Sequence, residues 1–186
     1  NTLAEFVKYA KDHPNTLTIG SAGVGTVTHL ANELFKSETG ITFTHVPYRS
    51  TSNSVTDLVG GQIDAIFGDV AILTPQVQKG TIKALAITSE KRSPLLPDLK
   101  TTAEAGLPNV QTEVWFGLFV PAGAPKPAVD RLKEAVRTAQ LDPEYKKNLL
   151  KYGTELNSVG ADQFADFIHA ETKRWTPILK AAGVKF

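Results

Sequence analysis

The sequence predicts an α/β fold in which a mostly parallel sheet is flanked by helices. Two observations support this prediction. First, short apolar or β-branched runs, which are typical of strands, alternate along the chain with longer segments whose apolar residues recur at helical spacing. Second, small or polar turns separate the two kinds of segment, as expected where each helix carries the chain back to begin the next strand in the same direction.

The alternation is clearest in the first half of the chain. In residues 26–38, Leu30, Leu34 and Phe35 fall on one face, and Gly40 follows as a helix terminator. We expect helices at residues 2–11, 26–38, 54–59 and 71–78, and strands at residues 17–19, 42–46, 63–67 and 82–88.

The composition changes after Ser89. Residues 92–107 are rich in Pro, Lys and Thr, and we expect one short helix within them, at residues 101–105. Residues 110–121 are apolar and aromatic, which predicts a long strand. Amphipathic patterns predict further helices at residues 125–140, 143–152 and 161–182, with a short strand at residues 155–159.

Composition excludes several classes of function. The net charge of +1 lacks the strongly basic character that nucleic-acid binding needs, so we expect no nucleic-acid partner. The absence of cysteine excludes disulfides, thiolate catalysis and cysteine zinc sites. The longest apolar runs are far too short to span a bilayer. The chain has no methionine and begins within a predicted helix, so we expect a processed or trimmed piece of a longer protein.

The first candidate binding element is the small-residue turn between the strand at residues 17–19 and the helix at residues 26–38. Backbone N–H groups at the start of a helix have no intrahelical partner, and the helix dipole adds partial positive charge there. This combination suits a carboxylate or phosphate, although the same residues also suit a tight turn with an ordinary helix cap. The candidate ligand-binding residues here are Ser21, Gly23, Gly25, Thr26 and Thr28.

Two further polar segments follow the next two strands. Arg49 could hold a carboxylate through two hydrogen bonds, and Ser50 could donate beside it, the alternative being a solvated loop with a capping hydroxyl. Asp69 could accept from a ligand or cap the next helix through its side chain; we favour capping, and both roles can coexist. Since the carboxyl ends of parallel strands share one edge of a sheet, we expect the three segments to lie together.

The sequence contains no legible catalytic or metal centre. His29 and His45 have no carboxylate or second histidine at metal-ligand spacing, and we interpret both as structural. There is no legible Ser-His-Asp set and no base beside an activated nucleophile. We therefore predict no enzyme activity, no cofactor and no metal.

Several motifs occur together and in one order: TIGSAGVGT at residues 18–26, HVPYR at residues 45–49, GQIDAIF at residues 61–67, and WFGL at residues 115–118 followed by PAG. As a set, they resemble the Bug receptors, the extracytoplasmic solute-binding proteins of tripartite tricarboxylate transporters. The resemblance covers essentially the whole chain. It differs at Ser50, where the family often has glycine, so the loop shape is expected to differ there.

The resemblance implies a type II periplasmic-binding-protein fold, in which two α/β lobes close over a ligand. It implies that residues 1–113 form the second ligand-binding lobe and that residues 114–123 form the hinge crossing. Residues 124–186 would complete the first lobe, which is otherwise largely missing. The family's second-lobe ligand contacts fall on Ser21, Gly25, Thr26, Thr28, Arg49 and Asp69 of this chain.

The expected function is therefore capture of a small carboxylate in the periplasm, either a di- or tricarboxylate, an aromatic acid or an amino acid. Hinge closure would trap the ligand, and membrane transporter subunits would recognise the closed form. The alternative is the effector-sensing domain of a transcription regulator, which shares this fold. A homodimer could form through the apolar surface left by the missing lobe.

Overall fold

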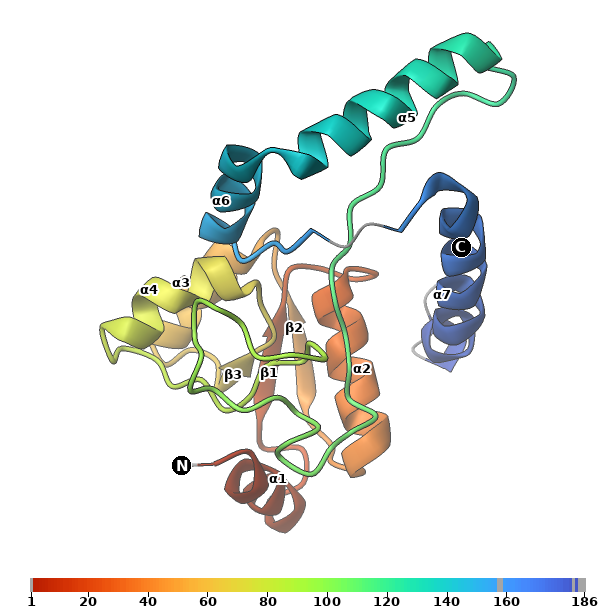
Figure 1. The fold of residues 1–186 in the computed structure, drawn as a ribbon. Helices are drawn as coiled ribbons and strands as arrows, with labels where there is room; N and C mark the ends of the chain where they lie inside the picture. The colour runs from red at the N-terminus through yellow and green to blue at the C-terminus, as the bar shows by residue number, and fades with distance from the viewer. Residues whose placement is uncertain (1, 157–158, 182, 184–186) are drawn as a thin grey trace. The chain divides into compact units, whose positions relative to one another are not determined.

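The computed structural model describes residues 2–156, 159–181 and 183, and its central element is a three-stranded parallel sheet (Figure 1). The strands are β1 (Thr18–Ser21), β2 (Thr44–Pro47) and β3 (Ala65–Ile66), in the order β2-β1-β3. Ile19 of β1 lies in register with His45 on one side and with Ala65 on the other. The predicted α/β class with a parallel sheet is confirmed.

Helices connect and flank these strands: α1 (Leu3–Asp12), α2 (Val27–Thr39), α3 (Thr51–Val59) and α4 (Val70–Gln78). Their ends follow from local chemistry. Thr2 and Glu5 form a reciprocal capping box at the start of α1, which satisfies two backbone N–H groups that the helix leaves free. Gly40 ends α2 in the left-handed conformation, with φ of 67°, which glycine adopts without a steric penalty.

The core lies between the sheet and the first two helices, and one residue from a later segment joins it. Phe35 of α2 is 2% exposed, and its ring lies 6.3 Å from that of Phe6 and 5.6 Å from that of Phe67. The buried core residues are Leu3, Ala10, Leu17, Ile19, Phe35, Ile41, Phe43 and Val110. Val110 shows that the segment beyond Ser89 packs on this core as well.

Several elements predicted in the second half of the chain differ from the structure. The run at residues 82–88 forms only an isolated bridge, between Ile87 and Thr101, and residues 101–105 form turns instead of a helix. Residues 110–121 form no strand. Both runs are apolar, but a strand needs a continuous ladder of hydrogen bonds with a neighbour. Within the described part of the chain, Ile87 bonds only locally with residues 100–102, and the two runs meet at the single backbone bond from the N–H of Thr112 to the carbonyl of Thr88. In the strand predicted at residues 155–159, residues 157–158 lie outside the described residues and the others form no strand.

Contacts along the chain divide it into two compact units, Asn1–Glu113 with Trp175–Phe186, and Val114–Arg174. The remaining helices are α5 (Lys126–Leu141), α6 (Pro143–Lys151) and α7 (Ala161–Ala181). Within the second unit, the Trp115 ring packs edge-on against Phe164 and Phe167 of α7, at 5.7 and 5.3 Å between centroids. Among the described residues, no helix is both long enough and apolar enough to cross a bilayer.

Candidate functional site

Polar loops follow the carboxyl ends of the strands, and the first two lie against each other. β1 and β2 end side by side, with Ser21 in register with Pro47. The N–H of Tyr48 donates to the carbonyl of Ser21 at 2.9 Å. The φ of 127° at Gly23 favours glycine, and a Cβ added there would also be tightly placed, 3.1 Å from the Tyr48 carbonyl.

The hydroxyl groups of the first loop are committed to the loop itself. Thr28 Oγ1 accepts from the N–H of Ala22 at 2.8 Å and lies 2.9 Å from Thr26 Oγ1. Thr26 Oγ1 donates to the carbonyl of Gly23 at 2.7 Å and accepts from the N–H of His29 at 3.4 Å. Since the Thr26 hydrogen is used on Gly23, Thr28 is the donor between the two hydroxyls. Thr26 and Thr28 therefore shape the loop and keep no hydroxyl hydrogen for a ligand.

Backbone groups remain available at the start of α2. The N–H groups of Val27 and Thr28 donate to no group in the described part of the chain, and they begin a helix of 13 residues. The helix dipole places partial positive charge at the same end. Gly25 lies beside them with φ of 81°, and no atom would lie within 4 Å of a Cβ added there. The loop thus presents two unpaired N–H donors next to open space, which suits an anion.

The second loop contains a helix cap and an exposed cation. Ser50 accepts from the N–H of Asn53 at 3.3 Å, which caps α3 and explains why this helix begins at Thr51 and not at the predicted residue 54. Arg49 is exposed, and its guanidinium makes no hydrogen bond or ion pair with the described residues. Tyr48, just before it, is fixed by a 2.8 Å hydrogen bond to Asp57. Burial raises the pKa of Tyr48, and this bond to Asp57 raises it further.

The third loop joins the second through Asp69. The prediction that the Asp69 side chain caps α4 is wrong: it occupies the capping position but makes no capping hydrogen bond. Its carboxylate instead accepts from the hydroxyl of Thr51 at 2.8 Å. Thr51 lies over Gly68, where an added Cβ would come within 2.7 Å of its methyl group, so the contact brings the two loops close together.

A buried layer lies behind the first loop. It contains Ser21, which was predicted to contact the ligand, and two histidines that were predicted to be structural only. Ser21 is fully buried, with 0% exposure, and its Oγ lies 2.7 Å from Nε2 of His45. The ring of His45 stacks on that of His29 at 4.4 Å. His29 Nδ1 in turn accepts from the N–H of Gly25 at 3.1 Å. Ser21 thus supports the loop from beneath instead of facing solvent.

His29 lies on α2 and His45 on β2, and the two meet because α2 packs on β1, which pairs with β2. One local signal was present in the sequence, because Glu33 lies one helical turn after His29 and its carboxylate is 3.9 Å from His29 Nε2. Burial lowers the pKa of both histidines, and for His45 the charge of His29 lowers it further. This lowering favours the neutral form of both rings. Within the described residues, no three His, Cys, Asp or Glu side chains gather as metal ligands.

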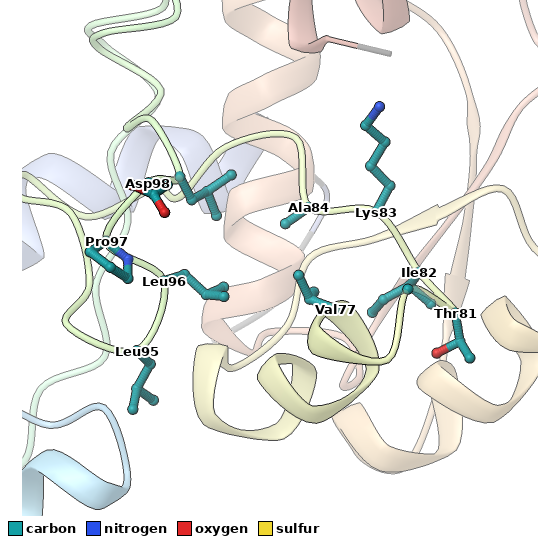
Figure 2. Close-up of a pocket in the computed structure, with 11 residues that line it drawn as sticks. Val77, Thr81, Ile82, Lys83, Ala84, Leu95, Leu96, Pro97 and Asp98 are labelled. Atoms are coloured by element: carbon teal, nitrogen blue, oxygen red, sulfur yellow. The ribbon is translucent and has the colours of Figure 1, made fainter.

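The concave surfaces of the first unit differ in character. An open groove of about 670 Å³ lies between the end of α4 and the loop at residues 95–99, and leucine, isoleucine and valine side chains dominate it (Figure 2). Its polar and charged lining residues are Thr81, Lys83 and Asp98, and it shares no residue with the three loops at the strand ends. A smaller polar depression of about 390 Å³ adjoins the second loop and is lined by Tyr48, Ser52, Asn53, Thr56 and Asp57.

Replacing Thr26 by valine is expected to lower the free energy of unfolding by about 1–2 kcal/mol, because it removes the cap of α2 together with the bond to Gly23. Urea denaturation followed by circular dichroism measures this change. Thr44→Val is the matched control, since Thr44 is exposed on β2 and its side chain makes no hydrogen bond with the described residues. Equal stability of the two variants would contradict the capping role of Thr26.

A parallel sheet with anion-suited loops at its carboxyl edge is the arrangement in which open α/β proteins bind small ligands. Residues 1–184 match the family described as TctC, the tripartite tricarboxylate transporter family receptor, and the chain belongs to this family. It is a family of receptors, not of enzymes. The resemblance found in the sequence motifs is thereby confirmed.

Relatives and solved structures agree with this assignment. The chain is 34% identical over 178 residues to the UPF0065 protein in the tcbD-tcbE intergenic region of Pseudomonas sp. (strain P51). The match covers 95% of this chain and 53% of that protein. It is 26% identical to protein BugT of Bordetella pertussis, over 100% of this chain and 57% of that protein. The chain thus spans about half the length of the curated relatives it matches.

Among solved structures, R. palustris Rpa4515 with adipate superposes with a TM-score of 0.86 at 32% identity, covering 98% of this chain and 61% of that one. The periplasmic binding protein BugD superposes with a TM-score of 0.84 at 30% identity, over 100% and 62% of the two chains. MatC from Rhodopseudomonas palustris with bound malate superposes with a TM-score of 0.81 at 30% identity, covering 96% of this chain and 62% of that one.

Proposed function

We propose that this chain supplies one face of a periplasmic receptor that captures a small carboxylate for a tripartite tricarboxylate-type transporter. The observation that carries the proposal is the pair of backbone N–H groups of Val27 and Thr28 at the start of α2, which have no acceptor in the part of the chain that the structure describes. Arg49 adds an exposed cation on the neighbouring loop, and it has no ion-pair partner among the described residues. Backbone donors and a guanidinium are the groups that hold carboxylates in proteins.

The class of ligand is inferred from this chemistry and from relatives. Adipate and malate, which are bound in two of the similar structures, are both small dicarboxylates. One carboxylate on the start of α2 and Arg49 would leave the rest of such a ligand for other parts of the receptor. The proposed ligand is therefore a small organic acid, with a dicarboxylate as the leading candidate over an aromatic acid or an amino acid.

The proposed mechanism is capture between two lobes. Residues 1–113 would form the second lobe, residues 114–123 the hinge crossing, and residues 124–186 the return to the first lobe. The run from Val114 to Val120 supports this reading, because its large apolar side chains are exposed, Phe116 by 83%. A contiguous exposed apolar run indicates a surface that packs against a further part of the protein. Closure of the lobes over the ligand would create the form that the membrane subunits recognise.

Arg49→Ala is expected to weaken binding of adipate or malate by about tenfold, because it removes a charge-assisted hydrogen bond. Isothermal titration calorimetry measures the affinity, and a thermal-shift screen of organic acids selects the ligand. Arg131→Ala is the matched control, since Arg131 is exposed on α5 and makes no hydrogen bond or ion pair with the described residues. Unchanged affinity in Arg49→Ala would remove Arg49 from the site, and the absence of any thermal shift would count against carboxylate capture by this chain.

A further inference from the structure

The stacked pair of His29 and His45 lies directly behind the loop of the proposed anion site. The rings are 4.4 Å apart between centroids, with 20° between their planes, and His29 is 5% exposed. One ring comes from α2 and the other from β2, so the pair bridges the helix that begins at the site and the strand next to it. Neither ring is used in binding as proposed above.

Each ring supports one glycine of the loop. Nδ1 of His29 accepts from the N–H of Gly25 at 3.1 Å. Nε2 of His45 lies 2.7 Å from Ser21 Oγ, and that oxygen accepts from the N–H of Gly23 at 3.1 Å. The N–H of Gly25 therefore bonds to the pair directly, and the N–H of Gly23 bonds to it through Ser21. This leaves the N–H groups of the next helical turn as the ones that face outward.

The hydrogen bond from Gly25 fixes the protonation state of His29. An N–H donates to Nδ1 only when that nitrogen carries a lone pair, so the hydrogen of the neutral ring sits on Nε2, 3.9 Å from the Glu33 carboxylate. Lys36 lies 3.3 Å from Glu33 and partly offsets its charge. Glu33 and Lys36 are the charged groups among the described residues that act on the pKa of both histidines, and His29 acts on that of His45 as well.

We propose that His29 and His45 are positioning residues: as a neutral stacked pair they hold the Gly23–Gly25 loop in its anion-binding shape, and their protonation releases it. The ligand part of this proposal rests on the proposed function. A proton on His29 Nδ1 would point at the N–H of Gly25, so that bond would be lost. A second positive ring stacked on the first would add repulsion within a buried site.

Lowering the pH should therefore loosen the Gly23–Gly25 loop by protonating the two histidines. Burial is the main cause that lowers the pKa of both rings below the ordinary value of 6.5. With a lowered folded-state pKa, the stabilisation by the neutral pair is complete above 6.5 and is lost as the pH falls through the folded-state pKa. A receptor built in this way binds its carboxylate more weakly in acid even while the carboxylate is still ionised.

The experiment uses two pairs of variants of the full chain. His29→Asn keeps an acceptor at the position of Nδ1, and His29→Leu removes it; His45→Gln keeps a polar group at the position of Nε2, and His45→Leu removes it. Amide hydrogen exchange of Gly23 and Gly25, expressed as protection factors, is followed by NMR from about pH 7.5 to about pH 5.5, where histidine titrates. Adipate and malate affinities are measured over the same range.

In the wild type, the Gly25 protection factor is expected to fall at acid pH together with the affinity. In His29→Asn, the Gly25 protection factor and the affinity at neutral pH should stay as in the wild type, and the Gly25 protection factor should no longer fall in acid. In His29→Leu, binding should weaken by roughly fivefold to tenfold, the loss of about one hydrogen bond. Protection of Gly25 that is equal in the wild type and His29→Leu overturns the proposal. So does wild-type protection without pH dependence, which decides the matter even if a leucine variant fails to fold. A wild type that shows the acid-sensitive protection but binds no acid supports the positioning role and refutes the proposed ligand.

Discussion

Phe35→Ala is expected to lower the free energy of unfolding by about 3–5 kcal/mol, the range for deletion of a buried aromatic ring. Phe35 is 2% exposed, and its ring lies between those of Phe6 and Phe67. It connects α2 to α1 and to the end of β3, so the cavity would open at the junction of three elements. Since small domains are stable by only about 5–15 kcal/mol, the loss is a large share of the total.

Urea denaturation followed by far-UV circular dichroism measures this change. Phe116→Ala is the control, because it deletes the same ring from a side chain that is 83% exposed, and its effect should stay within about 0.5 kcal/mol. A loss below about 1 kcal/mol for Phe35→Ala would contradict its place in the core. Comparable losses for both variants would contradict the assignment of Phe116 to the surface.

The α/β class and most of the first unit could be predicted from the sequence because the determining signals are local. The apolar face of residues 26–38 placed Phe35 toward the core, and Gly40 marked the end of α2. The three strands that pair in the sheet were predicted within a few residues of their observed bounds. Helical and strand periodicity report which face is buried, and that information is contained in the segment itself.

The predictions of strands at residues 82–88 and 110–121 were wrong for the same reason. An apolar, β-branched run indicates an extended conformation, but pairing depends on a neighbour elsewhere in the chain. Ile87 finds only an isolated bridge to Thr101. In the run from Val114 to Val120, the large apolar side chains stay exposed. Local sequence therefore predicted the conformation of these runs but not whether a partner strand was present.

The location of the candidate site was predictable, but the use of its side chains was not. The rule that ligands gather at the carboxyl edge of a parallel sheet led to the loops after β1, β2 and β3. It could not tell that the hydroxyls of Thr26 and Thr28 bond within the loop, because that depends on a backbone shape set by Gly23. The stacking of His29 on His45 depends on strand register, so it could not be predicted from the sequence either.

Gly20→Ala is the second prediction with a large expected effect, and it concerns the strand that leads into the site. A Cβ at Gly20 would lie 2.9 Å from a methyl group of Ile63, 3.0 Å from one of Ile66 and 3.3 Å from the ring of Tyr48. Contacts this short require the neighbours to move. Overpacking of this kind costs about 1–3 kcal/mol. The displaced Tyr48 would carry the second loop away from the first, so stability and carboxylate affinity should fall together.

Gly60→Ala is the matched control, because it adds the same methyl group in the same unit. Gly60 ends α3 at φ of −76° and ψ of −3°, and its added Cβ would meet no atom closer than 3.4 Å. Alanine fits this conformation, and the unfolded chain loses freedom, so the variant should be neutral or more stable by up to about 1 kcal/mol. Urea denaturation of both variants measures the difference, and opposite signs are expected. A Gly20→Ala variant as stable as Gly60→Ala would mean that β1, β3 and Tyr48 are not packed as closely as the contacts at Gly20 require, and the alignment of the two loops would then need another cause.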